Sequence, residues 1–189
     1  MAIKDFYIIA GCNGAGKTTA AYTVLPEILA CREFVNADEI ARGLSPFCPA
    51  SMALDAGKLM LKRIDELLAA GKSLAIETTL AARVYQKKIL AARANGYQIT
   101  LLFFWLRSAD LARERVRSRV AEGGHDIPPE VIARRYVSGI KNLFALYVPL
   151  VDATMIYDNT DGRKELIAAN KGEWHIFDRK KFDLMKESL

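Results

Sequence analysis

A segment near the N-terminus has the residue types and spacing of a phosphate-binding loop. The run Gly11-Cys12-Asn13-Gly14-Ala15-Gly16-Lys17-Thr18 fits the pattern G-x-x-x-x-G-K-[ST] at every fixed position. Its glycines adopt backbone conformations closed to other residues, so several N–H groups can turn toward one anion. We therefore expect Lys17 to reach the β- and γ-phosphates of ATP, and the Thr18 hydroxyl to hold Mg²⁺.

The segments on either side of this loop support that interpretation. Residues 6–10 form a short apolar run typical of a buried strand, and residues 19–29 have a helical pattern. The helix matters because its N-terminus adds a positive dipole end to the anion site. The alternative is a chance match in a glycine-rich turn. The motif predicts nucleotide contacts from Gly11, Asn13, Gly14, Ala15, Gly16, Lys17, Thr18 and Thr19.

Two carboxylates lie where other predicted strands end, and ligands bind beyond the carboxyl ends of strands in parallel sheets. Asp38 follows the strand at 33–36, where a carboxylate could accept the proton of a substrate hydroxyl. Alternatively, Asn36 or Asp38 simply caps the next helix. Position alone leaves both readings open.

The second carboxylate, Glu77, closes the apolar strand at 73–77 and is followed by Thr78. It could hold Mg²⁺ through water or bind a substrate hydroxyl, and Thr78 would contribute to the same substrate site. In the alternative interpretation, Thr79 caps a helix that begins at Leu80. Such capping by Thr79 would not assign any role to Glu77.

Arginines are concentrated between residues 107 and 135, where seven of them occur with five acids. Two glycines and two prolines separate two helical patterns there, which predicts a mobile helical lid over about 107–136. A helical projection sets Arg119 and Arg135 beside the apolar faces, so we expect both to bind phosphate. We expect Arg113, Arg117 and Arg134 to be solvated surface residues. His125, between the helices, could contact phosphate or cap a hinge.

Apolar runs of strand length alternate with helical patterns along the chain. This order predicts an α/β P-loop NTPase fold, with a parallel five- to six-stranded sheet covered by helices on both faces. We expect one domain over residues 1–189. The predicted strands are 6–10, 33–36, 73–77, 98–106, 153–158 and, as a further candidate, 174–177; the predicted helices lie near 17–30, 51–70, 81–95, 108–122 and 129–148.

Composition narrows the class of protein. The chain is 51% hydrophobic and 26% charged, as expected for a soluble globular domain, and no apolar run approaches the roughly 20 residues that span a bilayer. Its three separated cysteines and the absence of a signal peptide predict a reducing cytoplasm. A net charge of +5 is modest, which makes a nucleic-acid partner less expected than a small phosphorylated ligand.

Several motifs occur together in one order: residues 10–19, Asn36-Ala37-Asp38-Glu39-Ile40, Glu77-Thr78-Thr79-Leu80, residues 123–128 and Arg134-Arg135-Tyr136. This set resembles the zeta-toxin family of P-loop kinases in its short form, over roughly residues 6 to 160. The resemblance implies an ATP- and Mg²⁺-dependent kinase that phosphorylates a hydroxyl of UDP-N-acetylglucosamine or a similar nucleotide sugar.

The same resemblance implies roles for individual residues. Asp38 would be the general base, Lys17 and Thr18 would bind the nucleotide and Mg²⁺, Glu77 would lie near the substrate, and Arg119 and Arg135 would act on the phosphates. It also implies an antitoxin protein as a candidate partner. The residues themselves leave open two other readings, a nucleotide-hydrolysing switch ATPase and a polynucleotide-end kinase.

Overall fold

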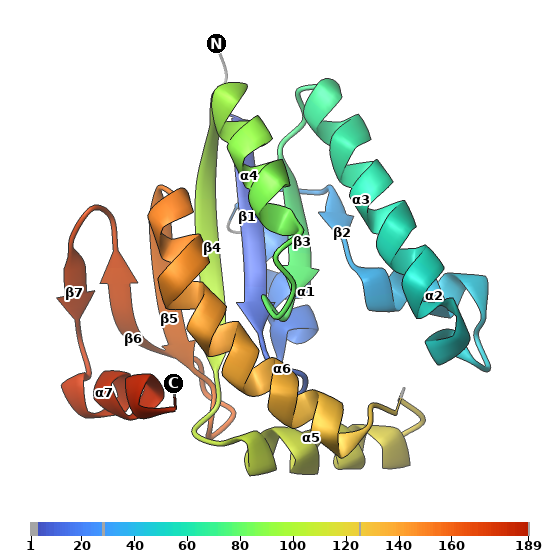
Figure 1. The fold of residues 1–189 in the computed structure, drawn as a ribbon, viewed down its shortest axis with the longest axis vertical. Coiled ribbons are helices and arrows are strands. Elements are labelled where there is room, and N and C mark those ends of the chain that lie inside the picture. Colours follow the sequence, from blue (N-terminus) through green and yellow to red (C-terminus); the bar gives the residue numbers. More distant parts are fainter. Residues whose placement is uncertain (1–3, 28, 125, 189) are drawn as a thin grey trace.

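The computed structural model describes residues 4–27, 29–124 and 126–188 of the 189-residue chain. At its centre is a seven-stranded sheet with the order β2-β3-β1-β4-β5-β6-β7 (Figure 1). The strands are β1 (Lys4–Gly11), β2 (Phe34–Val35), β3 (Leu74–Thr78), β4 (Tyr97–Trp105), β5 (Ala153–Asp158), β6 (Glu165–Asn170) and β7 (Trp174–Ile176).

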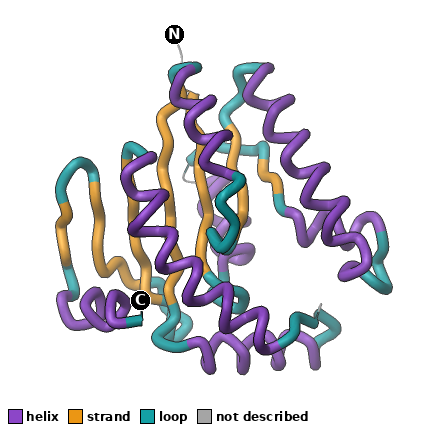
Figure 2. Tube along the Cα trace, viewed as in Figure 1, coloured by secondary structure: helices purple, strands orange, loops and turns teal. Residues whose placement is uncertain are grey.

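Helices cover both faces of this sheet, which gives the layered α/β arrangement visible in Figure 2. In Figure 1, α4 and α6 lie over the near face of the sheet and α1 lies behind it. The helices are α1 (Lys17–Glu27), α2 (Ala37–Leu44), α3 (Ala53–Ala69), α4 (Tyr85–Ala94), α5 (Ala109–Ala121), α6 (Pro129–Asn142) and α7 (Arg179–Glu187). Short 3₁₀ turns at Pro49–Met52 and Val148–Leu150 and a π-helical turn at Leu143–Tyr147 join them.

The central strands form the core because both of their faces are covered. β1 pairs in parallel with β3 on one side and β4 on the other, and Ile8, Ile76 and Leu101 are completely buried where these strands meet. Near-continuous apolar sequence is what such two-sided burial requires. The register of β1 between its neighbours brings the phosphate-binding loop to the edge where β3 and β4 also end.

The predicted fold class is confirmed, with two differences in the elements. β6 was not predicted, and it runs antiparallel to β5 and β7, so the sheet is parallel only from β2 to β5. β6 was missed because its sequence, ELIAAN, has no strand-like alternation and becomes a strand by pairing with β5. Helix α7 was also missed because it is short and largely polar, and α2 had been considered only as the helix that Asn36 or Asp38 would cap. No helix in the described ranges is long and apolar enough to cross a bilayer.

A partly exposed ion pair, of which only Asp158 is buried, joins the last helix to the end of β5. Lys181 Nζ on α7 lies 3.0 Å from Asp158 Oδ2 and 2.6 Å from Glu165 Oε2. Burial by itself would raise the pKa of Asp158, but hydrogen bonds from Thr160 and Lys181 outweigh it and lower that pKa below its ordinary value of 3.8.

This pair predicts a specific loss of stability in acid. A carboxyl whose pKa is lowered by folding stabilises the native state fully above pH 3.8, and this contribution disappears as the pH falls through the lower folded pKa. Asp158→Asn should therefore lower the melting temperature at pH 7 and flatten its decline between about pH 4 and 2. Thermal unfolding across this range measures both effects. Asp161→Asn, an exposed change in the following turn, should leave the pH profile of the parent unaltered.

Candidate functional site

The phosphate-binding loop connects β1 to α1, and two of its glycines are required by their backbone torsions and by close contacts. Gly11 has a φ of +140°, and a Cβ atom there would collide with the Phe104 carbonyl of β4. Gly16 has a φ of +79°, and a Cβ there would lie 2.6 Å from the side-chain nitrogen of Asn159. No other residue type satisfies both the torsion and the space at these positions.

Lys17, the first residue of α1, is buried within the loop that it follows. Its ammonium group donates a hydrogen bond to the Cys12 carbonyl at 2.9 Å and lies 3.6 Å from Glu77 Oε1. Only 6% of the Lys17 side chain is exposed. These contacts fix a positive charge beside the loop, as phosphate binding requires.

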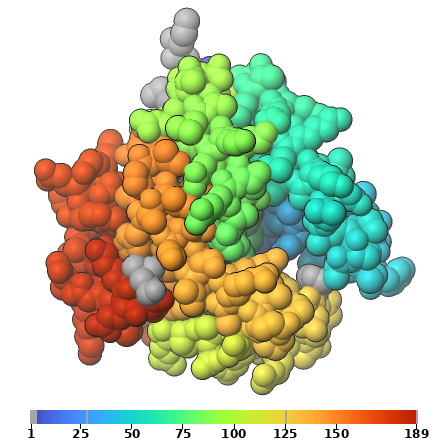
Figure 3. Space-filling view, in the orientation of Figure 1, coloured from blue at the N-terminus to red at the C-terminus, as the bar shows by residue number. Residues whose placement is uncertain are grey.

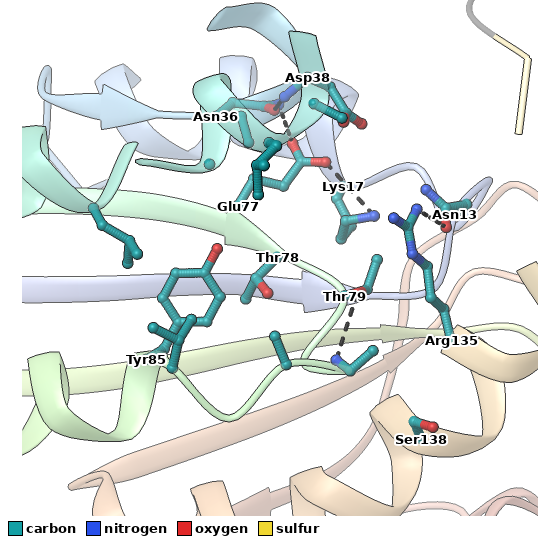
Figure 4. A pocket seen from close by; sticks show the side chains of 18 of the residues that line it. Asn13, Lys17, Asn36, Asp38, Glu77, Thr78, Thr79, Tyr85, Arg135 and Ser138 are labelled. Atoms are coloured by element: carbon teal, nitrogen blue, oxygen red, sulfur yellow. Dashed lines mark hydrogen bonds and ion pairs between the residues drawn. The ribbon is translucent and has the colours of Figure 1, made fainter. Parts of the chain in front are cut away.

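Glu77, at the end of β3, connects three segments of the site (Figure 4). Its Oε2 accepts hydrogen bonds from Thr18 Oγ1 at 2.8 Å and from Asn36 Nδ2 at 2.9 Å, while Oε1 faces Lys17. The side chain is only 8% exposed, so these partners are what make its burial tolerable. The adjoining Thr18 hydroxyl and Glu77 carboxylate are oxygen donors of the kind that Mg²⁺ prefers, so both fit the metal site predicted from the sequence.

The structure separates the two roles that the sequence left open for Asn36 and Asp38. Asn36 is the N-cap of α2, because its side-chain oxygen accepts a hydrogen bond from the Asp38 backbone N–H at 2.8 Å. The Asp38 side chain is exposed and lines the pocket that also contains Lys17 and Glu77. The sequence analysis did not identify Asn36 as a hydrogen-bond donor to Glu77.

The predicted capping role of Thr79 is wrong. Helix α4 begins at Tyr85, and Thr79 Oγ1 instead accepts a hydrogen bond from Ala81 N at 3.4 Å within a turn. Thr78 is buried, and its hydroxyl accepts a hydrogen bond from Leu80 N at 3.1 Å. Thr78 and Thr79 both line the pocket, so the end of β3 contributes an extended polar edge to it.

The arginines of α5 and α6 that line the pocket are only partly the ones that the helical projection predicted. Arg135 lines the pocket and donates to Asn13 Oδ1 of the phosphate-binding loop at 3.3 Å, in agreement with its predicted position (Figure 4). Arg134, predicted to point away, also lines the pocket. Arg113 pairs with Asp110 at 2.7 Å, as expected of a surface residue.

The remaining predicted lid residues are only partly accounted for. Arg119 is not among the described residues that line the pocket, and its Cγ atom and carbonyl group lie against Gly124, where they leave no room for a Cβ. Its role on phosphate stays a prediction. His125 lies outside the described residues.

Arg115 is a site residue that the sequence analysis did not single out. Its guanidinium donates to the Gly14 carbonyl at 3.5 Å and to the Thr160 carbonyl at 2.8 Å. It therefore ties α5 to the phosphate-binding loop and to the loop after β5. The available signal was its place four residues before Arg119 on the same helix edge.

Lys17, Asp38, Glu77 and Arg135 line one cavity of about 650 Å³. In the space-filling view it opens as a hollow between α3 and α6, with the N-terminal part of the chain at its base (Figure 3). Asn13, Lys17 and Arg135 lie close together on one side of it (Figure 4). Leu54, Val84 and Tyr85, from α3 and the segment after β3, add apolar surface to its lining. The cavity thus has room for a second molecule beside the phosphates of a nucleotide.

Comparisons with known proteins agree with this geometry. The sequence matches the AAA domain family over residues 7–136. It is 25% identical over 126 residues to an uncharacterized protein of Haemophilus influenzae, an alignment that covers 67% of this chain and 88% of that protein.

Among solved structures, the fold is similar to that of the AvrRxo1-ORF1:AvrRxo1-ORF2 complex, with a TM-score of 0.78 and 18% identity over 97% of this chain. The chain spans only 64% of that protein's length. The PezAT toxin–antitoxin system of Streptococcus pneumoniae matches with a TM-score of 0.67 and 16% identity, over 100% of this chain and 86% of the other. Shikimate kinase from Acinetobacter baumannii matches at 0.50 and 18%, over 81% and 83%. At these identities the likeness shows a shared fold, the P-loop NTPase fold.

The position of Arg135 predicts an effect on phosphate chemistry that a surface arginine should lack. Arginines on a transferring phosphoryl group contribute about 10³-fold or more to kcat, so Arg135→Ala should lower ATP turnover by that order. Arg117→Ala changes an exposed arginine on α5 and serves as the control. Steady-state measurement of phosphate release or transfer compares the two. Similar activities for the two variants would contradict the assignment of Arg135.

Proposed function

Because the chain belongs to the AAA domain family and brings a phosphate-binding loop, a buried carboxylate and an arginine to one pocket, we propose that it is a small-molecule kinase. It would transfer the γ-phosphate of ATP to a hydroxyl group. The observation that carries this proposal is Asp38, whose exposed carboxylate lines the same pocket as Lys17 while its helix is capped by another residue. A pure nucleotide switch has no need of a carboxylate at this place.

The residues divide the chemistry among them. The acceptor hydroxyl attacks the γ-phosphorus, Asp38 takes the hydroxyl proton, and the bond to the bridging oxygen of ADP breaks. Lys17 and Arg135 stabilise the negative charge on the transferring group, and the loop from Gly11 to Gly16 binds the other phosphates. Mg²⁺, held through Thr18 and Glu77, would neutralise phosphate charge. Crystals of the related AvrRxo1 complex have been obtained with ATP, which supports the choice of nucleotide.

Two further cations in the pocket lining favour an acceptor that carries its own negative charge. They are Lys58 of α3 and Arg134 of α6, and neither residue belongs to the phosphate-binding loop. The same lining includes the apolar side chains of Leu54, Val84 and Tyr85, against which a ring could pack. A nucleotide sugar such as UDP-N-acetylglucosamine combines a ring, a hydroxyl and phosphate charges, and it is the acceptor that the zeta-toxin resemblance implies.

We further propose that the chain acts as a single kinase domain over residues 1–189 and has a protein partner of the antitoxin class. The support is the similarity to a chain of the PezAT toxin–antitoxin system and to a chain of the AvrRxo1-ORF1:AvrRxo1-ORF2 complex. Cys12, Cys31 and Cys48 are free thiols, which suits a reducing cytoplasm.

The first test is transfer of labelled phosphate from ATP to a panel of nucleotide sugars, nucleosides and oligonucleotides. Asp38→Asn keeps the size of the side chain but cannot accept the proton, so transfer should fall by at least about 10²-fold with ATP binding retained. Glu39→Gln is the matched control, because Glu39 is a neighbouring carboxylate that pairs with Arg42 at 3.2 Å. Full activity in Asp38→Asn would remove the proposed base, whereas ATP hydrolysis without any acceptor would favour the switch ATPase.

The cations Lys58 and Arg134 in the pocket lining predict selectivity for anionic acceptors. Lys58→Glu should raise KM for UDP-N-acetylglucosamine at least about tenfold, the effect of losing roughly 1.4 kcal/mol of binding. KM for ATP should be unchanged. Lys62→Glu, one turn along α3 and paired with Glu66 outside the pocket lining, is the control. An equal effect of both substitutions would indicate a general charge effect on the protein and not a contact with the acceptor.

A further inference from the structure

The loop after β3 has a strained backbone where it borders the pocket. We call residues 78–82 the acceptor loop; Thr78, Thr79, Ala81 and Ala82 line the pocket, while Leu80 between them is fully buried. Leu80 has a φ of +58°, a left-handed conformation that residues with large side chains rarely adopt. Such strain persists only where the surrounding structure imposes it, and it gathers at functional sites.

Side chains of the loop itself supply part of this constraint. The hydroxyls of Thr78 and Thr79 accept hydrogen bonds from the backbone N–H groups of Leu80 and Ala81, at 3.1 and 3.4 Å. These local bonds close two successive turns but do not determine where the loop lies in the molecule. Its position must come from contacts with another element.

Helix α6 and the turn that follows it provide those contacts. Asn142, the last residue of α6 and only 6% exposed, donates from Nδ2 to the Leu80 carbonyl at 2.7 Å and to the Ala81 carbonyl at 3.2 Å. Both N–H groups of its amide are thereby used on the strained segment. The Tyr147 hydroxyl donates to the next carbonyl, that of Ala82. Three consecutive carbonyls of the loop are thus held from one side.

Gly139 brings the backbone of α6 directly against this loop. A Cβ atom at residue 139 would lie 2.5 Å from the Thr79 carbonyl oxygen, a separation that real Cβ atoms do not show. Arg135 lies four residues earlier on α6 and therefore on the same helix face. The helix that presents the phosphate arginine is also the one that contacts the acceptor loop.

Burial of α6 makes these two contacts parts of one rigid unit. Ile132, Tyr136 and Ile140 of this helix are at most 5% exposed and belong to the main core. The distance between Arg135 and the acceptor loop is consequently set by packing and not by closure of a mobile segment. Phosphoryl transfer depends on such distances, because displacing a reacting group by about 1 Å can cost 10²-fold in rate.

We propose that Gly139 and Asn142 are positioning residues for the acceptor. They hold the acceptor loop in its strained conformation at a fixed separation from Arg135, so that a bound hydroxyl is aligned with the γ-phosphate. This inference rests on the proposed kinase function. Neither residue touches the reacting groups; both act through Thr79, Leu80 and Ala81.

The test uses the full chain with Gly139→Ala and, separately, Asn142→Ala. Each should lower kcat/KM for UDP-N-acetylglucosamine by about 10²-fold, while KM for ATP and the basal rate of ATP hydrolysis stay within about twofold of the parent. Gly43→Ala is the control for the first, because a Cβ at that helical position meets nothing within 4 Å. Asn95→Ala is the control for the second, since its amide only donates to Ala91 O at an exposed helix end.

A second readout does not depend on catalysis. Hydrogen exchange of the Leu80 and Ala81 amides should be at least tenfold faster in both variants than in the parent, and unchanged in the two controls. If exchange stays slow, the loop is not held by α6 and the inference is overturned. If ATP parameters fall together with those of the acceptor, Gly139 and Asn142 are only structural, which also overturns it. If the parent protein binds ATP but phosphorylates no acceptor, the proposed kinase function is contradicted instead. The hydrogen-exchange measurement then tests by itself whether Gly139 and Asn142 hold the loop.

Discussion

The burial of one carboxylate is the constraint on which the rest of this site depends. Glu77 ends the strand next to β1 and is almost completely enclosed, so it is stable there only if hydrogen-bond donors and a positive charge surround it. Thr18 and Lys17 provide them from the first turn of α1, and Asn36 provides another from the start of α2. Three segments distant in sequence are therefore held at one point, with the phosphate-binding loop among them.

Asn36 shows how this constraint extends to the acceptor side. Its amide nitrogen satisfies Glu77 while its oxygen caps α2, so one side chain links the buried carboxylate to the helix that carries Asp38. If Asp38 were the N-cap of α2, its carboxylate would be hydrogen-bonded to the helix backbone. Because Asn36 is the N-cap, the Asp38 carboxylate is available to the pocket.

The pair of helices α5 and α6 is tied more firmly to the core than a freely moving lid would be. Arg115 links α5 to the carbonyls of Gly14 and Thr160, and Arg135 links α6 to Asn13. The apolar face of α6 packs into the main core. Preorganised donors of this kind stabilise charge without a reorganisation cost at the moment of transfer. Any closing movement would have to involve segments other than α6.

Local patterns in the sequence were sufficient to predict the phosphate-binding loop, the segments that form the parallel strands β1 to β5, and the two carboxylates at strand ends. Each follows from chemistry between near neighbours: glycine torsions, apolar periodicity and a carboxylate directly after a strand. The antiparallel β6, the ligand role of Asn36, the clamp formed by Arg115, and the pocket position of Arg134 depend on partners that lie far away in the sequence. Leu80 is the clearest case, because nothing in its own neighbourhood predicts a left-handed leucine. The Thr78 hydroxyl supplies part of the constraint locally, and the tertiary contacts of Gly139 and Asn142 add the close approach and the hydrogen bonds that hold the loop against its strain.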